Sequence, residues 1–383
     1  MSTLSPLLAA GHPVNWWFAF KFNGATYPCN ESLEPSRGIF GGAPMDYGGG
    51  LSLNYACASS DAPSLQMGTG FLGTSLNDPL GATFNQIYNG SCNYVIWNDQ
   101  FYNDPLENLD APWGHAKGVL AWDNTGAGLV IQVSTPSWPA AGSALHPRKT
   151  DGNTLGCVTD DDSMMSQHFF ALMLTPAEVA IVLNGLANAS VATAPANPQI
   201  VNVTGPADLK ALANALGVVS KSTAVTKQTL SSGVTFISKP SGLPVPPWQL
   251  VSSQLGGAPL RVACFWASPA INSTTAATPL ACWAASLGKP GAVQIATSGV
   301  WQGKAIGLTG GEDKTCNHAK IGVCQASNLC IFGDMNQQGT LGGNGQSCDI
   351  SQNGRGGMFY VLEQASLCSS LTALLNGNTA PLA

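Results

Sequence analysis

Short apolar runs that are rich in aromatic and β-branched residues recur along the chain, a pattern that is typical of β-strands. The clearest of these runs predict strands over residues 14–22, 94–97, 118–122, 129–133, 260–267, 329–332 and 358–362. No run is long and apolar enough to span a membrane. We therefore expect a globular protein with a framework of short strands.

Three segments carry helix signals instead. A capping box with proline at the first helical position begins at Thr175, and apolar residues continue to Leu186. Residues 206–216 have an aspartate in the first turn and end at a glycine, and residues 363–375 predict a terminal helix. Helices are thus fewer than strands.

The segment 188–205 between the first two helices is rich in small residues and proline, and is the best candidate for a hinge. Because strands and helices occur on both sides of it, we expect a mixed α/β (α+β) fold, with a central sheet flanked by helices in each half. The predicted division is an N-terminal half over 1–187 and a C-terminal half over 188–383. A single domain with a long surface loop at this segment is the alternative.

The low content of charged residues and the negative net charge limit how the protein can bind a polyanion. Charged residues make up only 9% of the 383 residues, and the formal net charge is −6. Binding of nucleic acid over a broad protein surface depends on many lysines and arginines that neutralise phosphates. With so few of them, any contact with DNA has to come from a local basic cleft. Protonation of all five histidines would bring the net charge to −1, so acidic conditions would reduce the repulsion.

Cysteine usage bears on the compartment. The 11 cysteines lack the spacing of zinc ligands, and their abundance beside so few lysines fits an oxidising compartment. The N-terminal residues MSTLSPLLAAGHP have neither a basic region nor a long apolar region, so no signal peptide is evident. We expect a secreted protein or one of an acidic, lysosome-like compartment.

The tripeptide His-Ala-Lys occurs twice, at residues 115–117 and 318–320. From the numbers of histidines and lysines, roughly 0.14 such spacings are expected by chance, so the recurrence is on the order of a one-percent event. An apolar strand follows each copy directly, and a second strand and a polar loop come next. The recurrence points to one chemical unit used twice.

The His-x-Lys spacing suits the handling of a phosphate. Side chains alternate along a strand, so the histidine and lysine of one motif project toward the same pocket. Lysine can neutralise the non-bridging oxygens, while histidine can attack phosphorus or transfer a proton. Two facing motifs would place a nucleophile and a general acid on opposite sides of one phosphate.

Metal-dependent chemistry has no comparable signal in the sequence. There is no carboxylate cluster of the two-metal type, and Asp160 to Asp162 are interpreted as a solvated loop. The remaining histidines, His12, His146 and His168, lack the context of the two motifs, and we expect them to be structural or solvated. We therefore expect no metal ligands and no cofactor.

Several longer stretches accompany the motifs, in the order PVNWWFAFK (13–21), IWNDQ (96–100), WGHAKGVLAWD (113–123), STPSWP (134–139), NHAKIGV (317–323), CIFGDMN (330–336) and NGRGG (353–357). Together they resemble the deoxyribonuclease II family of the phospholipase D superfamily, over essentially the whole chain. The resemblance implies a pseudo-dimeric, phospholipase D-like fold with the active site between two similar halves. It also implies an endonuclease that cuts double-stranded DNA at acidic pH without a divalent metal and leaves 3′-phosphate ends.

The resemblance also implies roles for particular residues. The catalytic set would be His115, Lys117, His318 and Lys320. Asp334 and Asn336 would support the phosphate or a histidine, with Ser134 as the counterpart in the first half. Family spacing suggests a disulfide between Cys330 and Cys348.

The chain departs from the family pattern next to the catalytic set. Ala116 and Ala319 occupy the middle positions, where a hydroxyl residue is usual, and Asn317 replaces an acidic residue. Our mechanistic hypothesis is a double displacement through a phosphohistidine. His115 is provisionally the nucleophile, and His318 is the general acid and later the base.

Two alternatives stay open. One is another phosphodiesterase of the superfamily that acts on lipid or RNA, although the chain has no amphipathic or basic stretch for binding a membrane. The other is a secreted binding protein or toxin that keeps the fold without turnover. The partner expected is DNA in a local cleft, with no membrane and no obligate protein partner, and a homodimer stays open.

Overall fold

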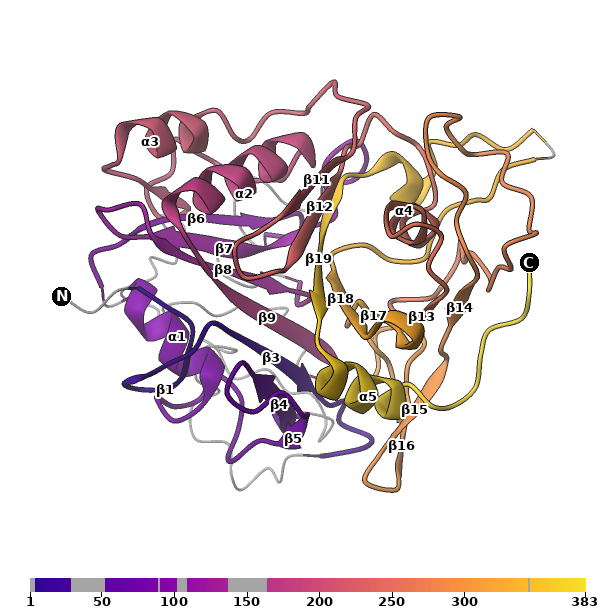
Figure 1. Ribbon diagram of the computed structural model, residues 1–383, viewed down its shortest axis with the longest axis horizontal. Helices are drawn as coiled ribbons and strands as arrows, with labels where there is room; N and C mark the ends of the chain where they lie inside the picture. The colour runs from indigo at the N-terminus through magenta and orange to yellow at the C-terminus, as the bar shows by residue number, and fades with distance from the viewer. Residues whose placement is uncertain (1–3, 29–51, 89, 102–108, 137–163, 344) are drawn as a thin grey trace.

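The computed structural model describes residues 4–28, 52–88, 90–101, 109–136, 164–343 and 345–383. His146 and Asp160 to Asp162, which the sequence analysis interpreted, lie outside these residues. The described part of the chain contains two large sheets and five α-helices (Figure 1). The predicted mixed α/β class is therefore confirmed.

The first sheet has eight strands in the order β10-β6-β7-β8-β9-β3-β4-β5, and every neighbouring pair is antiparallel. Its strands are β3 (Trp16–Lys21), β4 (Tyr55–Ser59), β5 (Gln66–Met67), β6 (Asn93–Asn98), β7 (Lys117–Trp122), β8 (Gly128–Val133), β9 (Gln167–Leu174) and β10 (Val201–Asn202). All residues of β3, β6, β7 and β8 are buried, so these strands are covered on both faces.

The second sheet has seven strands in the order β11-β12-β19-β18-β17-β13-β14, antiparallel except between β13 and β14. Its strands are β11 (Thr226–Thr229), β12 (Thr235–Lys239), β13 (Leu260–Ala263), β14 (Val293–Ile295), β17 (Ile321–Cys324), β18 (Leu329–Gly333) and β19 (Gly357–Glu363). Two small hairpins are β1 (Leu7–Ala9) with β2 (His12–Pro13), and β15 (Ser298–Trp301) with β16 (Lys304–Gly307).

The α-helices are α1 (Pro79–Tyr88), α2 (Pro176–Asn188), α3 (Ala207–Asn214), α4 (Pro247–Gln254) and α5 (Ala365–Leu374), with short 3₁₀ helices at Gln325–Ser327 and Ser351–Gly354. Helices α2, α3 and α5 confirm the three predicted helices. The capping box that begins α2 is formed, and in it the backbone N–H of Thr175 donates to Glu178 Oε2 at 2.8 Å. Every predicted strand is also present, with β13 shorter than its apolar run.

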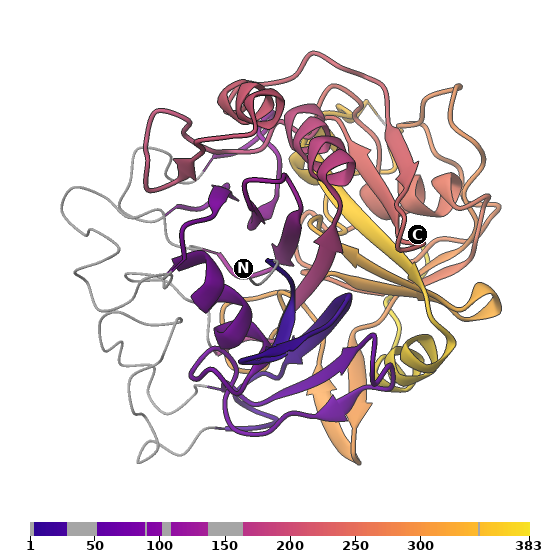
Figure 2. The ribbon, with the colours of Figure 1, turned by 60° about the vertical axis from the view of Figure 1, so that its left-hand side comes forward.

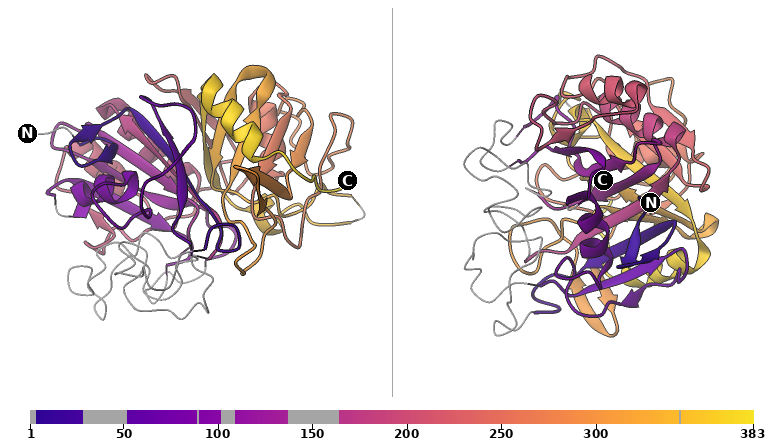
Figure 3. Two further views of the ribbon diagram at one scale, coloured as in Figure 1. Left: turned by 90° about the horizontal axis from the view of Figure 1, so that it is seen from below. Right: turned by 90° about the vertical axis from the view of Figure 1, so that its left-hand side faces the viewer.

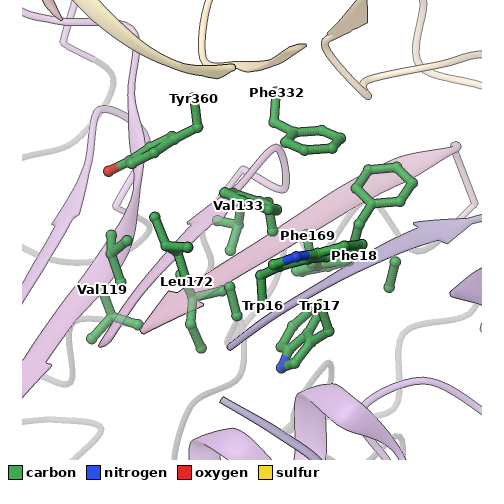
Figure 4. Packing of buried hydrophobic residues seen from close by; sticks show 14 of the residues in the cluster. Trp16, Trp17, Phe18, Val119, Val133, Phe169, Leu172, Phe332 and Tyr360 are labelled. Atoms are coloured by element: carbon green, nitrogen blue, oxygen red, sulfur yellow. The ribbon is translucent and has the colours of Figure 1, made fainter. Parts of the chain in front are cut away.

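The two sheets pack against each other, as Figure 2 and the left view of Figure 3 show. Between them lies an aromatic cluster to which both sheets contribute. The ring of Phe332 from β18 stacks on Phe18 from β3 at 4.7 Å and on Phe170 from β9 at 4.4 Å, measured between ring centroids. Figure 4 shows Phe332 and Tyr360 projecting from the second sheet toward the first. Burial of these large rings joins the two sheets into one core.

The chain between α2 and α3 runs along the edge of the first sheet. Asn98 N–H donates to Ala192 O at 3.0 Å, and Ile96 N–H donates to Ile200 O at 2.9 Å, before β10 pairs with β6. The segment that the sequence indicates as a hinge is thus packed against β6. Helix α2 contacts strands of both sheets. The division into halves at residues 187 and 188 stays a prediction.

One disulfide is present among the described residues. Cys282 and Cys348 are bonded, and they lie 66 residues apart in the chain. The Cys330–Cys348 pairing that family spacing suggested is therefore wrong: Cys330 is a buried thiol in β18. Spacing could not find the true partner, because Cys282 lies in an irregular segment that only the tertiary fold brings close to Cys348.

Candidate active site

Both His-Ala-Lys motifs line one cavity of about 640 Å³. Lys117 is the first residue of β7, while His318 and Lys320 lie in the extended segment just before β17, and His115 likewise precedes its strand. Each motif therefore lies at the start of its strand, which agrees with the prediction that an apolar strand follows each copy directly. Alternation of side chains still holds, because the intervening Ala116 and Ala319 are buried in the core.

His115 is oriented by the backbone of the second sheet. Its ring Nδ1 lies 2.7 Å from Asp334 O, and because a carbonyl only accepts, Nδ1 carries the proton. The lone pair of a neutral His115 is then on Nε2. Burial and the nearby ammonium of Lys117 lower the pKa of His115 well below its usual value, and Lys320 of the other motif lowers it further. Neutral His115 is thus the favoured form.

His318 is buried but has two neighbours that favour its protonated form. Burial and the ammonium of Lys320 lower the pKa of His318 to about 4. The carboxylate of Glu312 and the carbonyl of Gly311, which is 2.9 Å from Nε2, oppose that shift. The ring of Phe265 also packs against the imidazole in a T-shaped arrangement, with centroids 4.9 Å apart. Glu312 Oε1 lies 3.9 Å from Nε2, so a protonated His318 has a carboxylate beside it in the cavity.

Each motif histidine is docked by its backbone onto the opposite sheet. His115 N–H donates to Gly356 O at 2.8 Å, and Gly356 immediately precedes β19. His318 N–H donates to Ser166 O at 2.8 Å, and Ser166 immediately precedes β9. The two contacts are reciprocal, so neither sheet alone holds its own histidine.

A buried cluster of charges supports Lys117. Lys117 Nζ lies 2.6 Å from Asp99 Oδ1, and Arg355 Nη2 lies 2.8 Å from Asp99 Oδ2. Burial tends to raise the pKa of Asp99, but the nearby Lys117, His115 and Arg355 outweigh it and hold that pKa well below the usual range. Sequence reasoning assigned no role to Asp99 or Arg355, although both lie in stretches that carried the family resemblance.

Lys320 is held close to its own motif. Its Nζ donates to His318 O at 2.6 Å, and its backbone N–H donates to His168 Nδ1 at 3.1 Å. His168 is fully buried. Its burial, and to a smaller extent the charge of Lys320, lower the pKa of His168 well below the usual value. His168 thus contacts the backbone of the second motif and does not line the cavity. This placement fits the structural role expected for His168, whereas His12 is exposed beside Asp61.

The predicted supporting residues divide into two kinds. Asn336 and Ser134 line the cavity, whereas Asp334 lies behind its wall and offers its backbone oxygen to His115. The Asp334 carboxylate accepts from Gln132 Nε2 at 3.1 Å and from Met358 N–H at 3.0 Å. Burial nevertheless raises the pKa of Asp334 to about 8, so its carboxyl is neutral in acid. Asp334 thus supports the histidine through its main chain.

The charges that line the cavity are balanced. Three acidic residues, Asp99, Asp110 and Glu312, accompany three basic ones, Lys117, Lys320 and Arg355. Asp99 is buried against two of the bases, while the carboxylates of Asp110 and Glu312 are 99% and 72% exposed. Protonation of the two histidines would make the cavity positive. Acid would therefore favour the entry of an anion.

The two sheets bring paired His-x-Lys motifs into one cavity. Two imidazoles and two ammonium groups placed together in this way suit a class of protein that transfers a phosphoryl group. The family model described as deoxyribonuclease II matches residues 5–239, which is more than half of the chain. The chain therefore belongs to the deoxyribonuclease II family. Of the two motifs, the matched region contains the first.

A known protein is similar over a shorter stretch. Cell-death-related nuclease 7 from Caenorhabditis elegans is 32% identical over 105 residues, which are 26% of this chain and 27% of that protein. The match thus spans about a quarter of that relative.

Two further features of the described residues bear on function. No helix among them has the length and apolar character needed to cross a membrane. No group of three or more histidine, cysteine, aspartate and glutamate side chains in the described part of the chain is arranged to hold a metal ion.

Proposed function

We propose that the protein is an acid endodeoxyribonuclease that hydrolyses double-stranded DNA through a phosphohistidine, without a metal, and leaves 3′-phosphate ends. The observation that carries the proposal is the convergence of both His-Ala-Lys motifs on one cavity. The family supports DNA as the substrate. We further propose that the two sheets are the cores of two similar, phospholipase D-like halves, which the reciprocal docking of the histidines supports.

The environments of the two histidines support different roles in the first step. Neutral His115, with its proton on Nδ1, presents Nε2 to attack phosphorus. His318 has the Glu312 carboxylate 3.9 Å away to favour its protonated form, and in our proposal it gives a proton to the 5′-oxygen as the P–O5′ bond breaks. The product is a 5′-hydroxyl end and a 3′-phosphoryl group bonded to His115.

In the second step His318 takes a proton from water, and the resulting hydroxide attacks phosphorus. The P–N bond breaks, which releases the 3′-phosphate and restores both histidines. Lys117 and Lys320 stabilise the charged non-bridging oxygens in both steps. The protonated His318 must coexist with a neutral His115, and the low pKa of both in the free protein places that condition in acid.

Plasmid cleavage at pH 5 in the presence of EDTA tests the proposal. Wild type is expected to cut, and Lys320→Ala is expected to lower kcat by about 10²–10³ because one fixed charge on the phosphate is lost. Lys314→Ala, at an exposed position six residues earlier, is the matched control. Loss of wild-type activity in EDTA would overturn the metal-free mechanism, and preference for RNA or phosphatidylcholine would overturn the substrate.

The roles of the histidines can be separated with a substrate that has sulfur in place of the 5′-bridging oxygen. A thiolate leaves without a proton, so this substrate should restore a single-turnover burst of 5′-thiol release in His318→Asn but not in His115→Asn. Multiple turnover should not recover, because the second step still needs His318 as the base. Rescue of His115→Asn instead would reverse the assignment.

A further inference from the structure

Two lysines outside the cavity lining are completely buried. Lys21 ends β3 in the first sheet, and Lys239 ends β12 in the second. Burial of an ammonium group is costly unless its hydrogen-bond donors are satisfied, so such residues require a specific environment.

The environment of both ammonium groups is made of backbone carbonyls. Lys239 Nζ donates to Arg355 O at 2.6 Å, to Asn353 O at 2.9 Å and to Pro240 O at 3.3 Å. Burial lowers the pKa of Lys239 to about 7, so in acid the group still carries the three protons that these carbonyls accept. Loss of the side chain would leave the carbonyls unpaired.

Lys21 has the same kind of environment in the first sheet. Its Nζ donates to Met165 O at 2.6 Å and to Ser52 O at 3.1 Å. Lys21 pairs in register with Gln167, the first residue of β9. Lys21 therefore binds the segment that leads into β9 through the carbonyl of Met165, two residues before the strand.

Lys239 occupies the equivalent place in the second sheet. It pairs in register with Gly357, the first residue of β19, and the carbonyl of Arg355 lies two residues before that position. In both sheets the next carbonyl along the chain, Ser166 O or Gly356 O, is the one that accepts the N–H of a motif histidine. Each lysine is thus one peptide away from the docking point of the opposite histidine.

We propose that Lys21 and Lys239 are an equivalent pair of positioning residues. Each fixes the segment just before β9 or β19, and that segment holds the histidine contributed by the other sheet. Lys239 acts on His115 through Gly356, and Lys21 acts on His318 through Ser166. The consequence for catalysis rests on the proposed function, whereas the physical coupling does not.

Amide exchange of the histidines tests the coupling without any turnover. In protein labelled with ¹⁵N only at histidine, Lys239→Met is expected to speed exchange of the His115 amide at least about tenfold and to leave the His318 amide unchanged. Lys21→Met should do the reverse. Lys210→Met, at an exposed position on α3, should change neither amide. Equal effects on both amides, or an effect on the histidine of the same sheet, would overturn the proposal.

Activity supplies the second readout. Each methionine variant should lower kcat by about 10- to 100-fold with KM changed less than about twofold, because a displaced catalytic group impairs the chemical step more than substrate binding. Should methionine prevent folding, Lys21→Gln and Lys239→Gln keep two N–H donors and should show the same crossed pattern, only weaker. A wild type that does not cut DNA would refute the proposed function, while the exchange experiment would still decide the coupling.

Discussion

Replacement of Asp99 by asparagine tests the charge cluster behind the cavity. Asp99 is 1% exposed and bonds Lys117 and Arg355 at 2.6 and 2.8 Å. Asp99→Asn keeps the shape of the side chain but removes a negative charge that both of these buried cations contact directly. Removal of one partner from a buried ion pair typically costs about 3–5 kcal/mol.

This cost translates into a measurable change in Tm. The entropy of unfolding is about 2 cal/mol/K per residue, or roughly 0.8 kcal/mol/K for a chain of this length, so Tm should fall by about 4–6 °C. The pKa of Asp99 in the folded protein lies below its unfolded value, so its contribution is present above that unfolded value, about 3.9, and is lost only in stronger acid. The deficit should therefore be the same at pH 5 and at pH 7.

Asp110→Asn is the matched control. Asp110 lines the same cavity and lies 3.9 Å from the same arginine, but its side chain is 99% exposed. An exposed pair of this kind contributes about 0–1 kcal/mol, so Tm should change by no more than about 1 °C. Thermal unfolding followed by circular dichroism measures both variants. If the two variants lose the same stability, the reasoning about the buried cluster is refuted.

Three further predictions follow from single features. Because His318 must be protonated and its pKa is about 4, kcat/KM should fall about tenfold per pH unit above about pH 5, and a flat profile to pH 7 would contradict its role as the acid. Replacement of Cys282 and Cys348 by alanine should cost about 4 kcal/mol in urea unfolding, since the bond closes a 66-residue loop; an unchanged midpoint would contradict this. Gly356→Ala should cost about 1–3 kcal/mol, because a Cβ there would meet a backbone oxygen at 2.0 Å, whereas Gly205→Ala meets nothing within 4 Å.

Strands and helix ends could be predicted where the signal is local. The capping box at Thr175 formed as read, and the apolar runs became strands. Helix α1 was missed although its start has a local signal: Asp78 precedes Pro79 and caps Gly81 N–H at 2.8 Å. Strand β9 was missed because its apolar run continues almost directly into the signal for α2.

The supporting groups of the site could not be found in the same way. Asp99 and Lys117 are 18 residues apart, and Arg355 lies 256 residues after Asp99. The backbone oxygen that orients His115 belongs to Asp334. A contact made by the main chain does not depend on the type of side chain, so the residue type at position 334 could not predict it. Sequence indicates which residues can do chemistry, whereas the groups that hold them depend on how the two sheets meet.

The dependence of each motif on the other sheet also bears on how far the family match reaches. The matched region ends at residue 239, so it contains the first motif but not Asp334, Arg355 or Gly356. These three residues orient the ring of His115, pair with Asp99 and accept the His115 N–H, respectively. The first motif can therefore take this arrangement only when the second sheet is present. The C-terminal part of the chain therefore supports the first motif, in addition to carrying the second one.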